Sequence, residues 1–69
     1  MFRAMYWENH KWVEGQVGSD NWELYSSLYC WAVEANASGE RHIENVCVID
    51  LLTGEVVEEA HGEIGEYPW

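Results

Sequence analysis

Residues 20–39 read DNWELYSSLYCWAVEANASG and carry the local signals of a single helix. Asp20 and Glu23 have the spacing of a capping box, in which each side chain bonds a free backbone amide at a helix start. Polar residues then recur at three- and four-residue intervals and leave a wide apolar face. Gly39 stands where the end of a helix favours a left-handed residue. These signals predict a helix; a strand over residues 24–35 is the alternative, because both of its faces would be half apolar.

A β-hairpin is predicted on the N-terminal side of this helix. Residues 2–7 are rich in aromatic side chains and form its first strand, and residues 11–15 form the returning strand. The turn between them includes Asn9, which tolerates the left-handed conformation that a tight hairpin requires.

A second hairpin is predicted after the helix. Residues 42–50 are dense in β-branched side chains and form a strand. Residues 51–54 make a turn, and residues 55–60 return as the partner strand. Residues 61–69 contain glycines and a proline, so this tail is expected to be irregular.

The order of elements predicts an α+β fold, in which a small antiparallel sheet of about four strands in ββαββ order packs on one helix. The 69 residues form a single compact domain over residues 1–69. A domain of this size buries only about 60% of the surface of its unfolded chain. Ten aromatic residues supply much of the buried area, so no cofactor is needed to explain folding.

The aromatic residues are expected to divide between the core and the surface. Leu28 and Trp31 belong to the predicted apolar face of the helix and would pack against Val46 and Val48 of the sheet. Trp and Tyr are also favoured anchors at protein interfaces. The candidates for exposed anchors are Tyr6, Trp12, Tyr67 and Trp69. Tyr67 and Trp69 would also hold the tail to the rest of the domain.

The charge balance excludes several classes of function. Three basic residues stand against thirteen acidic ones, which gives a net charge of −10. Binding to DNA, RNA or an anionic membrane depends on many Lys and Arg side chains, and here only Arg3, Lys11 and Arg41 are present. No apolar run is long enough to cross a membrane, and the first residues lack the apolar segment of a signal peptide. We therefore expect the protein in the cytoplasm.

No catalytic or metal-binding pattern is present. The chain has no Gly-rich phosphate loop, no GxSxG and no HExxH. Cys30 and Cys47 form no metal signature and are expected to be reduced thiols, with a single disulfide as the alternative. His10, His42 and His61 stand beside turns or strand ends, where solvent-facing side chains are usual. We expect neither an enzyme nor a cofactor or metal site.

The carboxylates form an array that becomes more negative along the chain. Residues 1–19 are balanced, residues 20–49 hold five acids and one arginine, and residues 50–69 hold six acids and no Lys or Arg. Acidic surfaces also keep small domains soluble, but a net charge of about 2–8 suffices for that. The array therefore favours steering toward a basic partner. The predicted partner-binding residues are Glu34, Glu40, Glu44, Asp50, Glu55, Glu58, Glu59, Glu63 and Glu66.

In its small size, strong acidity, α+β architecture and lack of a catalytic signature, the chain resembles the phage-encoded anti-CRISPR inhibitors and related anti-defence proteins. The resemblance covers the whole chain and rests on these features rather than on a shared motif. It implies a DNA mimic, whose carboxylates would occupy a basic DNA-binding surface of a CRISPR-Cas effector and block target binding. A subunit of a type I effector is the expected target, and the inhibitor itself is expected to be a monomer.

A second hypothesis is a small adaptor or regulatory module that binds a protein through exposed Trp and Tyr side chains. In that case the charge would serve only solubility. The two hypotheses differ in their response to salt, since electrostatic mimicry weakens at high ionic strength and apolar anchoring hardly changes.

Overall fold

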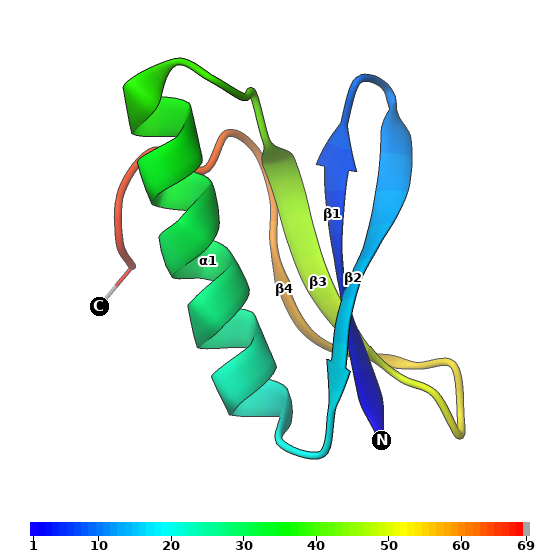
Figure 1. The fold of residues 1–69 in the computed structure, drawn as a ribbon. Helices are drawn as coiled ribbons and strands as arrows, with labels where there is room; N and C mark the ends of the chain where they lie inside the picture. Colours follow the sequence, from blue (N-terminus) through cyan, green and yellow to red (C-terminus); the bar gives the residue numbers. More distant parts are fainter. Residues whose placement is uncertain (69) are drawn as a thin grey trace.

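A computed structural model describes residues 1–68 and has four strands and one helix in the described part of the chain. These elements are β1 (Phe2–Glu8), β2 (Lys11–Gly18), α1 (Asn21–Ser38), β3 (Glu44–Asp50) and β4 (Val56–Ala60). All neighbouring strands are antiparallel, in the order β2-β1-β3-β4. The helix covers one face of the sheet, and no element covers the other (Figure 1). The predicted α+β fold is confirmed, and the strand alternative for residues 24–35 is wrong.

Helix α1 begins and ends at the residues that the sequence indicated. The Asp20 carboxylate accepts bonds from the backbone amides of Trp22 at 3.0 Å and Glu23 at 3.2 Å, so it satisfies two amides that the first turn leaves free. Gly39 caps the other end with φ of 78°, a left-handed conformation that costs a residue with a Cβ more than it costs glycine.

The first hairpin is tight and longer than predicted. Its two turn residues, Asn9 and His10, both have positive φ (54° and 63°), which matches the turn type that follows the right-handed twist of paired strands. Strand β2 extends to Gly18 instead of residue 15. It contains a bulge, because Arg3 pairs with Val17 while Met5 pairs with Glu14.

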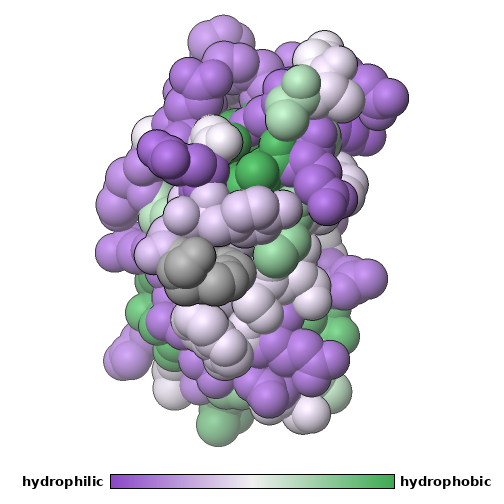
Figure 2. All heavy atoms as spheres, turned by 90° about the vertical axis from the view of Figure 1, so that its left-hand side faces the viewer, coloured by the Kyte–Doolittle hydropathy of each residue, from purple (hydrophilic) through white to green (hydrophobic). Residues whose placement is uncertain are grey.

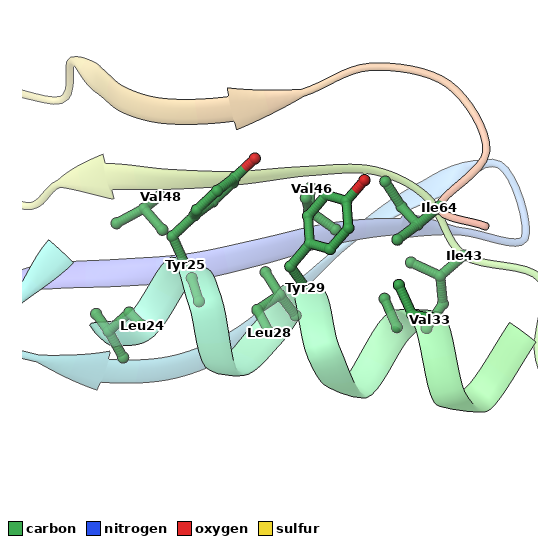
Figure 3. Packing of buried hydrophobic residues seen from close by; sticks show 11 residues of the cluster. Leu24, Tyr25, Leu28, Tyr29, Val33, Ile43, Val46, Val48 and Ile64 are labelled. Carbon is green, nitrogen blue, oxygen red and sulfur yellow. The ribbon is translucent and has the colours of Figure 1, made fainter. Parts of the chain in front are cut away.

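The core lies between α1 and the covered face of the sheet (Figure 3). Leu28 of the helix and Val46 and Val48 of β3 are buried together, as predicted. Trp31 was expected beside them, and this prediction is wrong. Its side chain is 38% exposed at the edge of the core, where it packs edge to face with Tyr6. The two ring centres lie 5.1 Å apart.

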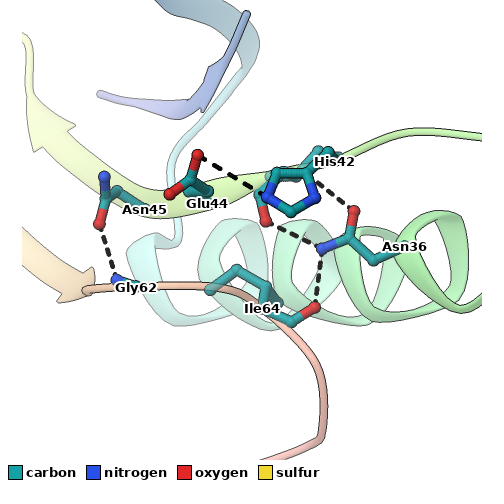
Figure 4. Close-up of polar contacts among 7 residues, drawn as sticks. Asn36, His42, Glu44, Asn45, Gly62 and Ile64 are labelled. Carbon is teal, nitrogen blue, oxygen red and sulfur yellow. Dashed lines mark hydrogen bonds and ion pairs between the residues drawn. The ribbon is translucent and has the colours of Figure 1, made fainter. Parts of the chain in front are cut away.

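The C-terminal tail is irregular, as predicted, and Ile64 holds it to the core. Ile64 is 1% exposed and joins the core, and its backbone N–H donates to the Ile43 carbonyl. The Asn36 side chain donates to the carbonyl oxygens of Ile43 and Ile64 and accepts from the Ile43 amide, all at 2.8 Å (Figure 4). Tyr67 is 46% exposed, and Trp69 lies outside the described residues.

Helix α1, the helix of residues 1–68, is not long and apolar enough to cross a bilayer.

Candidate functional site

The arginines are neutralised on the β1–β2 side of the molecule. Arg3 forms an ion pair with Glu14 at 3.3 Å, across β1 and β2. Arg41 forms an ion pair with Glu8 at 2.8 Å, and its guanidinium lies 5.3 Å from the Trp31 ring centre. Lys11 stands at the register position opposite Glu8, at the end of the same hairpin. All three positive charges therefore lie on or beside this hairpin.

None of the nine predicted carboxylates forms an ion pair with an arginine of residues 1–68. Within residues 1–68, the two ion pairs that involve arginine use Glu8 and Glu14, neither of which belongs to the predicted set. Five members follow the chain from the start of β4 into the tail, where no Lys or Arg occurs. We call this group the β4–tail acidic surface: Glu55, Glu58, Glu59, Glu63 and Glu66.

Within this surface, Glu58 and Glu59 point to opposite faces of the sheet, as expected for adjacent strand residues. Glu58 pairs in register with Val48 on the helix side, and Glu59 pairs with Cys47 on the open side. Because β4 is an edge strand, both carboxylates flank one accessible edge. A partner that approaches this edge would meet both charges.

The two carboxylates act electrostatically on their neighbours. Burial, then the nearby Tyr29 and the charge of Glu58, raise the pKa of the Tyr25 hydroxyl. Figure 3 shows the hydroxyl groups of Tyr25 and Tyr29 pointing from the helix toward the β3–β4 side of the sheet. On the open face, burial and then the charge of Glu59 raise the pKa of the Cys47 thiol.

Two further members lie near the C-terminal end of α1. Glu34 is exposed on the helix, and Glu40 is exposed just after the Gly39 cap. The last turn of α1 contains no basic residue. The C-terminus of a helix carries a partial negative charge, so it adds to the negative potential of these carboxylates. Asn36 joins the same part of the helix to the tail.

Asp50 and Glu44 differ from the other predicted residues. The Asp50 carboxylate accepts a bond from the Leu52 amide at 2.8 Å, so it shapes the turn between β3 and β4. Glu44 is half-buried and lies 3.8 Å from His42. The array is therefore not a single stripe, and the β4–tail acidic surface is the part of it that lies in a stretch of sequence without Lys or Arg.

The side of the molecule that carries α1 and the tail is largely hydrophilic. Figure 2 shows this side, with hydrophilic residues over its upper part and outer rim and hydrophobic residues only in scattered places. Glu34, Glu63 and Glu66 are exposed, as a surface that meets a charged partner requires.

The histidines are exposed. His61 lies 3.4 Å from Glu59, and its side chain is 77% exposed; the His42 side chain is also mostly exposed. Among residues 1–68, no group of three or more His, Cys, Asp or Glu side chains could hold a metal ion. Both cysteines are free, so the disulfide alternative is wrong.

The exposed aromatic side chains differ in part from those predicted. Trp12 and Tyr67 are exposed as expected, at 45% and 46%. Tyr6 is instead half-buried against the core. Trp22, at 54%, was not among the candidates, because the amphipathic pattern assigned it to the apolar face of the helix.

Comparisons with protein-family models, curated proteins and solved structures find no match for this chain.

Proposed function

We propose that this protein is an acidic inhibitor that occupies a basic, DNA-binding surface of another protein and prevents DNA from binding there. One observation carries the proposal. The two arginine ion pairs of residues 1–68 are on the β1–β2 side, whereas the carboxylates of the β4–tail acidic surface face no Lys or Arg.

The chemistry of the carboxylate supports this function. Carboxylate and phosphate oxygens accept hydrogen bonds from the same Arg and Lys donors, and Arg often binds either group with two parallel bonds. Side chains on β4 hold their charges at positions fixed by the sheet, as the phosphates of a DNA strand are fixed by its backbone. A rigid array loses less conformational entropy on binding than a flexible acidic tail of the same charge.

Inhibition would follow from competition. A protein that reads DNA holds its Arg and Lys side chains in a groove, and occupancy of that groove by carboxylates excludes the DNA phosphates. The long-range field of ten net negative charges also accelerates encounter with such a surface. The resemblance to anti-CRISPR proteins implies a DNA-binding subunit of a CRISPR-Cas effector as the partner, with a type I effector as the first target to test.

A competition assay with purified type I effector complex and labelled target DNA tests the proposal. The wild-type chain is expected to displace the DNA, and the Glu58→Lys/Glu59→Lys variant is expected to lose this activity.

The matched control compares two single reversals at opposite ends of one row of the open sheet face. Glu59 lies on β4 and Glu14 on β2, and their neighbours in the row are Cys47 and Met5. Glu59→Lys is expected to weaken displacement clearly more than Glu14→Lys. Equal effects, or no displacement by the wild-type chain, would contradict the proposal.

A second candidate function is protein binding through aromatic side chains, and the open face of the sheet favours it. Trp7 and Trp12 contact each other there edge to face, with ring centres 5.5 Å apart, and the Trp12 side chain is 45% exposed. Trp12→Ala would abolish partner binding through this face and leave charge-mediated binding unchanged.

A further inference from the structure

A groove of about 380 Å³ runs between the helix and the β1–β2 hairpin. Its floor is made by Ala4 and Gly15, and its walls by Tyr6, Leu28 and Trp31. Binding sites for small groups typically measure about 300–1,000 Å³ and are mostly apolar with a few polar positions. This groove has the same character and is large enough for one bulky side chain of a partner.

The groove exists because small residues replace large ones below the helix. Ala4 is 3% exposed, and Gly15 has no side chain. A Cβ at Gly15 would lie 2.9 Å from the Ala4 carbonyl oxygen, so no larger residue fits without a shift of the backbone. The two aromatic walls, Tyr6 and Trp31, hold each other in place through their edge-to-face contact.

A second hollow of about 280 Å³ continues the groove toward the N-terminus of α1. The two hollows share Gln16, Leu24 and Ser27. Two carboxylates, Asp20 and Glu23, line the second one. Asp20 is engaged as the helix cap, and Glu23 is exposed, with no ion pair to any of residues 1–68. The apolar part of the groove is therefore followed by an acidic end.

The bulge in β2 favours an inserted side chain over an added strand. Strand β2 is the edge of the sheet, and a free edge can pair with a strand of a partner. Gly15 and Gln16 both stand opposite Ala4, however, and such a two-to-one bulge interrupts the regular row of free backbone groups. The bulge lies at the groove, so we expect a partner to bind there by inserting its side chains rather than by pairing its backbone with β2.

We propose that this groove binds an extended segment of a partner protein that carries an aromatic or large aliphatic side chain and, two residues away, a Lys or Arg. The apolar side chain occupies the space above Ala4 and Gly15, beside the contacting rings of Tyr6 and Trp31, and the basic side chain reaches Glu23. Residues two apart in an extended segment lie on the same side, which places both in the groove. The site is separate from the β4–tail acidic surface and does not rest on the function proposed for it.

A titration with synthetic peptides, followed by the backbone amide signals in two-dimensional NMR spectra, tests the proposal. The probe is acetyl-Gly-Phe-Gly-Lys-Gly-amide, in millimolar excess over the labelled full-length chain. Saturating shifts are expected at the amides of Gly15 and Ser27. A peptide with Glu in place of Lys should bind about fivefold more weakly, and one with Gly in place of Phe should cause no shift.

Variants of the chain locate the site. Ser27 is exposed at the side of the groove, so Ser27→Phe fills the space without a change in the core and should abolish the shifts. Glu23→Gln should weaken binding about threefold, whereas the matched change Glu34→Gln, outside the groove on the same helix, should have no effect. Glu58→Lys/Glu59→Lys should also leave the titration unchanged, which separates this site from the acidic surface.

Three results would overturn the proposal. These are the absence of any saturating shift, equal binding of the Lys and Glu peptides, and shifts that persist in Ser27→Phe. The last would assign the peptide to another surface, such as the aromatic pair on the open face of the sheet.

Discussion

Asn36 determines where the C-terminal tail lies. Its amide group forms hydrogen bonds with one backbone N–H and two backbone carbonyl oxygens. These belong to Ile43, in the segment just before β3, and to Ile64, in the tail. These partners lie 7 and 28 residues away in the sequence. The tail carries Glu63 and Glu66, so Asn36 acts together with the buried Ile64 to hold part of the acidic surface in position.

Asn36→Ala is expected to lower the free energy of unfolding by about 2–4 kcal/mol, because the Ile43 amide and the Ile64 carbonyl lose the partner that Asn36 provides, while the Ile43 carbonyl keeps its bond from the Ile64 amide. Urea denaturation measures this loss, and faster hydrogen exchange at the Ile64 amide reports release of the tail. Asn45→Ala is the control: it removes one bond, to the exposed Gly62 amide, and should cost about 1 kcal/mol or less. Equal costs for the two variants would contradict this role of Asn36.

Cys47 provides a second test at the scale of a residue. Its thiol is buried on the open face of the sheet, and burial followed by the charge of Glu59 raises its pKa. Only the thiolate reacts with alkylating reagents, so Cys47 should react more slowly than Cys30 at pH 8. Glu59→Gln removes the smaller of the two causes and should shift the pH profile of the Cys47 reaction to lower pH. An unchanged profile would show that Glu59 exerts no field there.

Among the secondary-structure elements, the helix was predictable because its signals are local. Asp20 and Gly39 act within one turn of the helix ends, and the structure places the ends there. The exposure of Trp31 was not predictable in this way, because it depends on where the helix crosses the sheet. The small side chains of Ala4 and Gly15 open a groove beside Trp31, and nothing in the helix sequence indicates it.

The N-cap of α1 can be tested directly. Asp20→Ala should lower the free energy of unfolding by about 1 kcal/mol, because two backbone amides lose their acceptor. For a domain of this size that corresponds to a fall in melting temperature of about 4–8 °C. Ser19→Ala, at the adjacent exposed position, should leave the melting temperature nearly unchanged. A loss as large as that of Asp20→Ala would argue against the cap.

For the whole molecule, the sequence predicted the sign and the gradient of charge but not its partition in space. Counting residues shows that acidity grows toward the C-terminus. The ion pairs of the two arginines follow only from the packing of the strands and of the loop after the helix. Arg3 is paired with Glu14, and Arg41 with Glu8. Likewise, the opposite faces of Glu58 and Glu59 follow from their being neighbours on one strand, but their shared edge follows from the order of strands in the sheet.

This partition predicts how binding responds to salt. Screening shortens the reach of a charge from about 10 Å at 0.1 M to about 3 Å at 1 M ionic strength. Contacts between carboxylates and Arg or Lys side chains should therefore weaken steeply over this range, whereas apolar contacts should not.

The most direct test measures the affinity of the chain for a purified type I effector complex over that range of sodium chloride. Binding through the β4–tail acidic surface predicts a fall of at least about tenfold for the wild-type chain, and weak binding with a much shallower salt dependence for Glu58→Lys/Glu59→Lys. Wild-type binding that is equally tight at both ends of the range, or unaffected by the double reversal, would contradict the account.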